Sequence, residues 1–178
     1  MSRYVLIAGP NGVGKSTIYG LTPDMKGITY INLDKLEKHS SGKQAVSIIE
    51  DCFAHNASMV RETTLCGRTI VSSIERALDA GYEVSIHFIG IESEDICRKR
   101  IKSRVARGGH NISDTDLHRR FSKSYEQVRK LIPVCSELYF YDNTEYFKKV
   151  AKYSAGKEVW HAANLPQWYV NLITEFTL

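Results

Sequence analysis

Short apolar runs alternate with amphipathic segments along this chain, and the alternation predicts strands and helices in turn. Residues Tyr4 to Ala8 form an apolar run with β-branched and aromatic side chains, as a strand buried on both faces requires. Comparable runs predict further strands, in chain order, over residues 28–32, 58–62, 83–90 and 138–141. A hairpin is expected around Ala155 and Gly156.

The segments between these runs carry helical spacing and helix-boundary residues. Ile70, Ile74 and Leu78 recur every four residues and Gly81 follows as a C-cap, which predicts a helix over 68–80. A capping-box pattern at residues 41–44 starts a helix to about residue 56. Other helices are predicted from Ser16, over 93–107, from 113 to before Pro133, and after Pro166.

Strands that alternate with helices indicate βαβ units with right-handed crossovers. The predicted fold class is therefore α/β, with a mainly parallel sheet of about five strands covered by helices on both faces. Ligands of such sheets bind at the carboxyl ends of the strands. Residues just past the predicted strand ends are accordingly expected to meet in one crevice.

Composition narrows the class of protein. A chain of 178 residues suits one domain, and no apolar run approaches the roughly 18 residues of a membrane span. The chain enters its first strand directly, so we expect no signal peptide, and its four cysteines form no C-x-x-C pair. We therefore expect the four cysteines to be reduced thiols and the protein to be located in the cytoplasm. The net charge of +4 agrees with an anionic substrate without requiring nucleic acid.

The segment after the first strand matches the phosphate-binding loop G-x-x-x-x-G-K-[ST]. Such a loop turns backbone N–H groups toward a phosphate, and the following helix presents its positive end to the same anion. Lys15 is expected to reach the outer phosphates and the Ser16 hydroxyl to ligate Mg²⁺. The predicted nucleotide-binding residues of the loop are Gly9, Pro10, Asn11, Gly12, Val13, Gly14, Lys15, Ser16 and Thr17.

Polar residues follow the next strands. Asp34 can orient an acceptor hydroxyl and take its proton, or it can cap a short helix. Glu62 and Thr64 can bind a polyhydroxylated acceptor, or form a polar loop before the next helix, which Arg68 opens. We count Arg68 with the acceptor-binding residues. Asn143 can contact the nucleotide base or serve as a turn residue.

A basic run without acidic residues extends from Arg98 to Arg107, is followed by Gly108-Gly109-His110, and resumes at Arg119-Arg120. This composition is typical of a lid whose arginines close over a triphosphate and whose glycines allow a hinge. The alternatives are a solvated helix face and an RNA-binding patch. We place the helical, arginine-rich lid at about residues 93–130.

Several blocks together resemble the zeta toxin family of P-loop kinases. The phosphate loop with its preceding Ile7-Ala8 is the first block, and it alone is shared by many unrelated NTPases. The more specific blocks are Asn32-Leu33-Asp34, Glu62-Thr63-Thr64-Leu65-Cys66-Gly67 and Arg104-Val105-Ala106-Arg107-Gly108-Gly109-His110 with Arg119-Arg120-Phe121. The blocks occur in order across about residues 4–143. One departure is Cys66, which stands where serine is common in the family.

The resemblance implies a P-loop NTPase-type three-layer fold and an ATP- and Mg²⁺-dependent kinase. Members of the family phosphorylate the 3′-hydroxyl of the sugar in UDP-N-acetylglucosamine and are inhibited by an antitoxin. By the same resemblance Asp34 is the catalytic base, Lys15 is the loop lysine, and Glu62 and Thr64 contact the sugar. Arg104 and either Arg119 or Arg120 correspond to the arginines that face the γ-phosphate.

We therefore predict that residues 1–178 form a single P-loop kinase domain acting on a small hydroxylated acceptor, such as a UDP-sugar. An antitoxin would be a separate chain. Two other readings compete with this one: a nucleotide-dependent ATPase or switch module, and a nucleic-acid end kinase. The switch reading is weakened because no N-K-x-D signature occurs. The end kinase ranks last because no aromatic residues interleave the basic run, so nucleic acid is not an expected partner.

Overall fold

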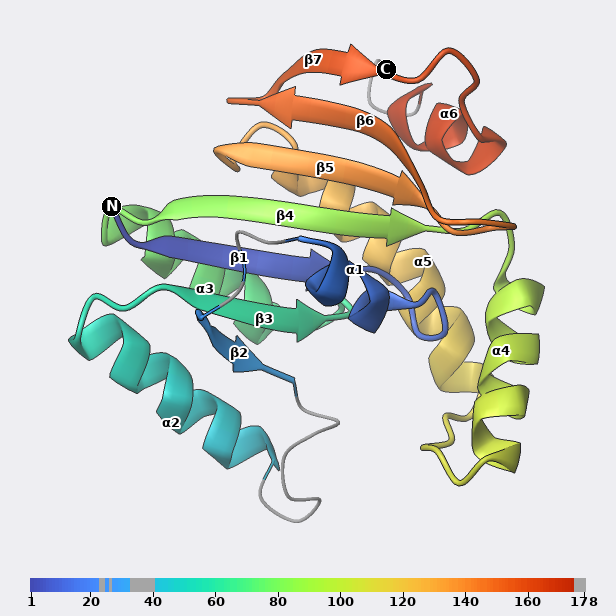
Figure 1. Ribbon diagram of the computed structural model, residues 1–178, viewed down its shortest axis with the longest axis horizontal. Helices are drawn as coiled ribbons and strands as arrows, with labels where there is room; N and C mark the ends of the chain where they lie inside the picture. The colour runs from blue at the N-terminus through green and yellow to red at the C-terminus, as the bar shows by residue number, and fades with distance from the viewer. Residues whose placement is uncertain (23–24, 26, 33–40, 175–178) are drawn as a thin grey trace.

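One seven-stranded sheet forms the centre of the molecule, with strand order β2-β3-β1-β4-β5-β6-β7 (Figure 1). The computed structural model describes residues 1–22, 25, 27–32 and 41–174. The strands are β1 (Arg3–Ala8), β2 (Thr29–Ile31), β3 (Met59–Thr63), β4 (Glu83–Gly90), β5 (Glu137–Asp142), β6 (Lys148–Ser154) and β7 (Lys157–His161). Strands β1 to β5 pair in parallel, which confirms the α/β class and the mainly parallel sheet.

The sheet has seven strands where the sequence predicted about five. The two additional strands are β6 and β7, the arms of the hairpin expected around Ala155 and Gly156. Ala155 and Gly156 have φ angles of 47° and 77°, which reverse the chain tightly. β6 then pairs antiparallel with β5, so the hairpin extends the sheet instead of standing apart from it.

Helices cover the sheet on both faces. They are α1 (Lys15–Leu21), α2 (Ser41–Ala54), α3 (Arg68–Asp79), α4 (Glu94–Ala106), α5 (Asp114–Leu131) and α6 (Gln167–Thr174). The helices pack against the sheet through two clusters of buried hydrophobic side chains. Helices α2, α3 and α6 contribute to one cluster, and α1 and α4 contribute to the other. α5 contributes Leu117 to the second cluster and Val128 and Leu131 to the first. The end of the segment predicted as a lid is therefore part of the core layer.

The central strand β1 shows why the sheet needs both layers. Tyr4, Leu6 and Ala8 pack into one cluster, while Val5 and Ile7 pack into the other. Alternate side chains of a strand point to opposite faces, so a run of consecutive apolar residues must be covered on both.

None of the helices in the described ranges is long and apolar enough to span a membrane.

A buried histidine lies on the β4–β5 part of the sheet. His87 is 7% exposed, and its ring stacks on Tyr139 with centroids 4.7 Å apart. Its Nδ1 is 3.1 Å from the hydroxyl of Tyr141. Burial, reinforced by the charge of Lys149, lowers the pKa of His87 to about 4 from 6.5. The folded protein therefore binds this proton less readily than the unfolded chain does.

We predict that acidification destabilises the protein through His87. Above about pH 6.5 the neutral ring makes its full contribution to the free energy of unfolding. This contribution is lost as the pH falls toward 4, and the loss of stability reaches about 3 kcal/mol there. About 2 kcal/mol of this loss is already present at pH 5, so urea unfolding at pH 7 and pH 5 measures it. The His87→Asn variant, which removes the titration, is expected to show a flatter dependence over this window. An equal pH dependence in both proteins would contradict the assignment.

Candidate nucleotide and acceptor site

The loop between β1 and α1 adopts the conformation that a phosphate-binding loop requires. Gly9, Gly12 and Gly14 have φ angles of 141°, 84° and 88°, which side-chain-bearing residues rarely adopt. A Cβ atom on Gly9 would lie 2.3 Å from the carbonyl oxygen of Ile89, at the end of β4. The loop backbone is therefore packed directly against the neighbouring strand, as a cradle that only glycine permits.

Asn143, just past β5, holds this loop from the other side. Its Nδ2 donates a hydrogen bond to the carbonyl of Val13 at 2.7 Å, and the Val13 side chain is fully buried. A Cβ on Gly14 would lie 2.7 Å from the same Nδ2. The structure thus gives Asn143 a role in bracing the loop, whereas its contact with a nucleotide base stays a prediction.

The residues that follow the loop suit a phosphate and its metal ion. Lys15 is 9% exposed, and its Nζ donates to the carbonyls of Gly9 and Pro10, each at 3.0 Å. Ser16 and Thr17 are exposed in the first turn of α1. The Asn11 Oδ1 is shielded from solvent and accepts no hydrogen bond from the part of the chain that the structure describes. The glycine cradle, the lysine and the helix end together fit a nucleotide phosphate, and Ser16 offers a hydroxyl to Mg²⁺.

A cavity of about 140 Å³ joins the loop to the ends of β2 and β3. It brings together five residues that the sequence predicted for the site: Asn11, Lys15, Glu62, Thr64 and Arg120. Asn32, Arg61 and Thr63 complete its lining. The carboxyl ends of adjacent parallel strands meet at one sheet edge, which is why residues so far apart in sequence converge here.

Glu62 is held in place by two donors from β2 and its end. Its Oε2 accepts from the Tyr30 hydroxyl at 2.7 Å and from the Asn32 Nδ2 at 2.8 Å. Burial, and then the bond to Glu62, raises the pKa of Tyr30, so the phenol remains a donor at neutral pH. No hydrogen bond to the Oε1 of Glu62 occurs within the described ranges. That oxygen is the one available to a ligand hydroxyl.

Cys66 connects the loop after β3 to α5. Its Sγ lies 3.1 Å from the carbonyl oxygen of Thr64 and 3.2 Å from that of Arg120, so the single thiol proton is shared between these two acceptors. Burial raises the pKa of this thiol, which therefore stays protonated as a donor. Cys66 stands where serine is common in the zeta toxin family. The cysteine thus keeps a short side chain that can donate a hydrogen bond at this position. Through it, the position of Thr64 is coupled to the backbone at Arg120.

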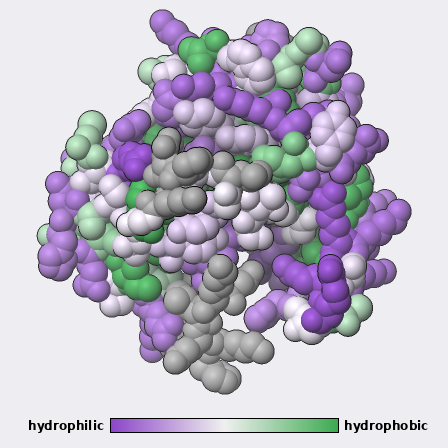
Figure 2. All heavy atoms as spheres, in the orientation of Figure 1, coloured by the Kyte–Doolittle hydropathy of each residue, from purple (hydrophilic) through white to green (hydrophobic). Residues whose placement is uncertain are grey.

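Three arginines were predicted to face the γ-phosphate, namely Arg104, Arg119 and Arg120, and of these Arg120 alone lines the cavity. Arg119 is exposed and donates to Asp116 at 2.8 Å, and Arg104 donates to the carbonyl of His110 at 2.8 Å. The charge of the basic run is also partly neutralised, because Arg98 forms ion pairs with Glu94, Asp95 and Asp114. Hydrophilic residues dominate the surface over α4 (Figure 2). The catalytic roles of Arg104 and Arg119 stay predictions.

Two predicted site residues cannot be placed. Asp34 lies outside the described residues, and so does the side chain of Arg68, whose backbone opens α3. The roles assigned to both from the sequence therefore stay predictions. Conversely, sequence reasoning assigned no function to Tyr30 or Arg61. An arginine within a parallel strand, where an apolar residue is the norm, was the available signal for Arg61.

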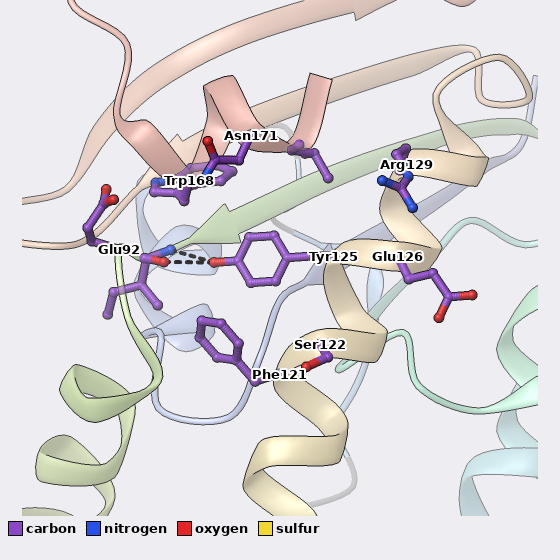
Figure 3. A pocket seen from close by; sticks show the side chains of 10 residues that line it. Glu92, Phe121, Ser122, Tyr125, Glu126, Arg129, Trp168 and Asn171 are labelled. Atoms are coloured by element: carbon purple, nitrogen blue, oxygen red, sulfur yellow. Dashed lines mark hydrogen bonds between the residues drawn. The ribbon is translucent and has the colours of Figure 1, made fainter. Parts of the chain in front are cut away.

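A separate cavity of about 330 Å³ lies between α5 and α6, and Tyr125 projects into it (Figure 3). The Tyr125 hydroxyl donates to the carbonyl of Ile91 and accepts from its N–H, both at 2.9 Å. It is therefore occupied in holding the end of β4. This cavity shares no lining residue with the one beside the phosphate loop.

Comparison with known proteins places this chain by its fold. No family model matches it. An uncharacterized protein of Haemophilus influenzae is 28% identical over 131 residues, which cover 67% of this chain and 93% of that protein. A structure from the PezAT chromosomal toxin–antitoxin system of Streptococcus pneumoniae superposes with a TM-score of 0.68 at 15% identity. That match covers 98% of this chain and 84% of the other.

A chain of the AvrRxo1-ORF1:-ORF2 complex superposes with a TM-score of 0.71 at 14% identity and covers 97% of this chain. The present chain spans 63% of that protein, which is also known in a structure with ATP. The fold and the loop together define a P-loop protein of the α/β class. At this level of fold, the solved structures support the resemblance to the zeta toxin family drawn from the sequence.

We predict that Gly9→Ala destroys the loop. The added Cβ meets the Ile89 carbonyl, and a φ of 141° is strained for alanine. We therefore expect the free energy of unfolding to fall by at least about 2 kcal/mol and nucleotide binding to be lost. Urea unfolding and titration with ATP measure the two effects. Gly20→Ala, in α1 with open space around the position, is the control and should leave binding intact and stability equal or higher.

Proposed function

We propose that this chain is an ATP-dependent kinase of the zeta toxin type, which transfers the γ-phosphate of ATP to a hydroxyl of a small acceptor. The observation that carries the proposal is the cavity in which Lys15 of the phosphate loop meets Glu62, Thr64 and Arg120. A phosphate-binding lysine and a carboxylate with a free oxygen thereby face the same space. Phosphoryl transfer needs this combination, because its catalysis depends chiefly on positioning the acceptor hydroxyl and on stabilising the charge of the transferred phosphoryl group.

Each residue has a distinct role in the proposal. The loop glycines and Lys15 hold the phosphates, and Ser16 ligates Mg²⁺, which neutralises charge on the transferred group. Glu62, held by Tyr30 and Asn32, accepts a hydrogen bond from the acceptor and orients it. Arg120 stabilises the phosphoryl group from α5. Asp34 takes the proton of the attacking hydroxyl, as the family resemblance implies.

UDP-N-acetylglucosamine is the proposed acceptor, on the family resemblance. A separate antitoxin chain is the proposed regulator, which the likeness to structures from a toxin–antitoxin system supports at the level of fold. The ion pairs of Arg98 reduce the basic character of the run from which nucleic-acid binding would arise. A small-molecule acceptor is therefore favoured over a nucleic-acid end.

We predict that the purified protein, given Mg²⁺, ATP and UDP-N-acetylglucosamine, adds one phosphate to the sugar nucleotide, detected by mass spectrometry. Asp34→Asn should lower turnover by about a hundredfold or more and leave the Kd for ATP nearly unchanged. The control is Asp79→Asn, which alters an exposed carboxylate at the end of α3 and should have no effect.

Unchanged turnover in Asp34→Asn would exclude Asp34 as the base. If no product forms while ATP still binds, UDP-N-acetylglucosamine is not the acceptor, and the same assay is extended to other hydroxylated metabolites. If ATP fails to bind in the presence of Mg²⁺, the kinase proposal itself is wrong.

A further inference from the structure

Arg61 is a charged residue in the interior of a parallel sheet. It lies in β3, in register with Leu6 of β1 on one side and Ile31 of β2 on the other. Strands buried on both faces are normally apolar along their length. A guanidinium at this point needs either a counter-ion or a function.

The protein supplies Arg61 with little compensation. One terminal nitrogen donates to the hydroxyls of Tyr4 and Ser73, and both distances are 3.4 Å, at the long limit for hydrogen bonds. The Nε is shielded from solvent and has no hydrogen-bond partner among the described residues. No carboxylate among residues 1–22, 25, 27–32 and 41–174 forms an ion pair with it. Arg61 is half-buried, and a guanidinium with a shielded Nε and no counter-ion is stabilised when a ligand provides the opposite charge.

Arg61 is a lining residue of two cavities. It lines the 140 Å³ cavity beside Lys15 and Glu62, and it also lines a groove of about 600 Å³ between α2 and α3. The groove combines apolar side chains with the hydroxyls of Thr69, Ser72 and Ser73. A second arginine of the groove, Arg76, is already neutralised by two bonds to Glu50 at 2.6 and 2.9 Å.

We propose that Arg61 determines acceptor specificity by binding an anionic group, a phosphate or a carboxylate, on the acceptor. The acceptor hydroxyl lies at Glu62, the anionic group lies at Arg61, and the remainder of the molecule extends into the α2–α3 groove. The planar guanidinium suits both anions, because it can donate two parallel hydrogen bonds. The inference rests on the proposed kinase function for the identity of the ligand, but the anion site can be tested without turnover.

The first test follows the Nε–H signal of Arg61 by NMR, assigned by its loss in Arg61→Met. Inorganic phosphate and citrate are titrated separately into protein saturated with Mg²⁺ and a non-hydrolysable ATP analogue, so that the phosphate loop is filled. We expect the signal to move and saturate with at least one of the two anions, and the stronger response identifies the anion class. A signal unmoved to about 50 mM of both would overturn the proposal.

Failure of the kinase proposal is distinguishable from failure of this one. If the ATP analogue does not bind, the same titration is run on Lys15→Met without nucleotide, and the Arg61 signal still decides. Binding of an anion at Arg61 in that case would leave the site standing and the kinase function refuted.

A second test separates binding from a structural role. Arg61→Met keeps the length of the side chain and removes the charge, so we expect an unchanged or raised Tm without anion, and loss of the Tm increase that the anion gives the wild type. With an acceptor that is turned over, its KM should rise about 10- to 100-fold with kcat nearly unchanged. Arg61→Lys should be intermediate.

The matched control is Arg129→Met, which removes a half-buried guanidinium from the separate cavity between α5 and α6, away from both cavities that Arg61 lines. It should leave both the anion response and the acceptor KM unchanged. A marked fall in Tm for Arg61→Met, or equal effects of the two variants on the acceptor KM, would show that Arg61 is structural and the proposal wrong.

Discussion

The close approach of the phosphate loop to its neighbours is the constraint on which the site depends. Gly9 lies against the carbonyl of Ile89, and Gly14 lies against the amide of Asn143 that also binds Val13. These contacts come from β4 and from the residue after β5, so the loop conformation is determined by the sheet as well as by its own glycines. The loop can then present backbone donors to a phosphate without reorganising.

The order of the strands carries this constraint to the acceptor side. β1 lies between β3 and β4, so the loop is flanked by Glu62 on one side and by Ile89 on the other. Tyr30 and Asn32 reach Glu62 because β2 is the next strand outward. α5 adds Arg120, and Cys66 ties the backbone there to the loop that carries Thr64. The proposed nucleotide and acceptor halves of the site therefore lie together at one edge of the sheet.

Some charged side chains in this region are fully paired and others are not, and the incompletely paired ones line the proposed site. Glu50 and Arg76 neutralise each other at the surface, and Arg98 is surrounded by acids on α4 and α5. In contrast, Glu62 keeps one oxygen open and Arg61 has no anionic partner in the described chain. Proteins keep polar groups incompletely satisfied mainly where a ligand completes them.

The sequence by itself determined the α/β class, the position of each strand and helix, and the phosphate loop, because hydrophobic period, capping residues and glycine spacing are local properties. It also indicated Glu62 and Thr64, since strand ends of a parallel sheet converge, and Arg120, from the basic composition and the family resemblance. Only the tertiary structure decided that the hairpin joins the sheet, that Asn143 braces the loop, that Tyr30 donates to Glu62, and that Arg61 lines the cavity. Those facts depend on pairings between residues distant in the chain, and no local pattern encodes which strand edge or which side chain a residue will meet.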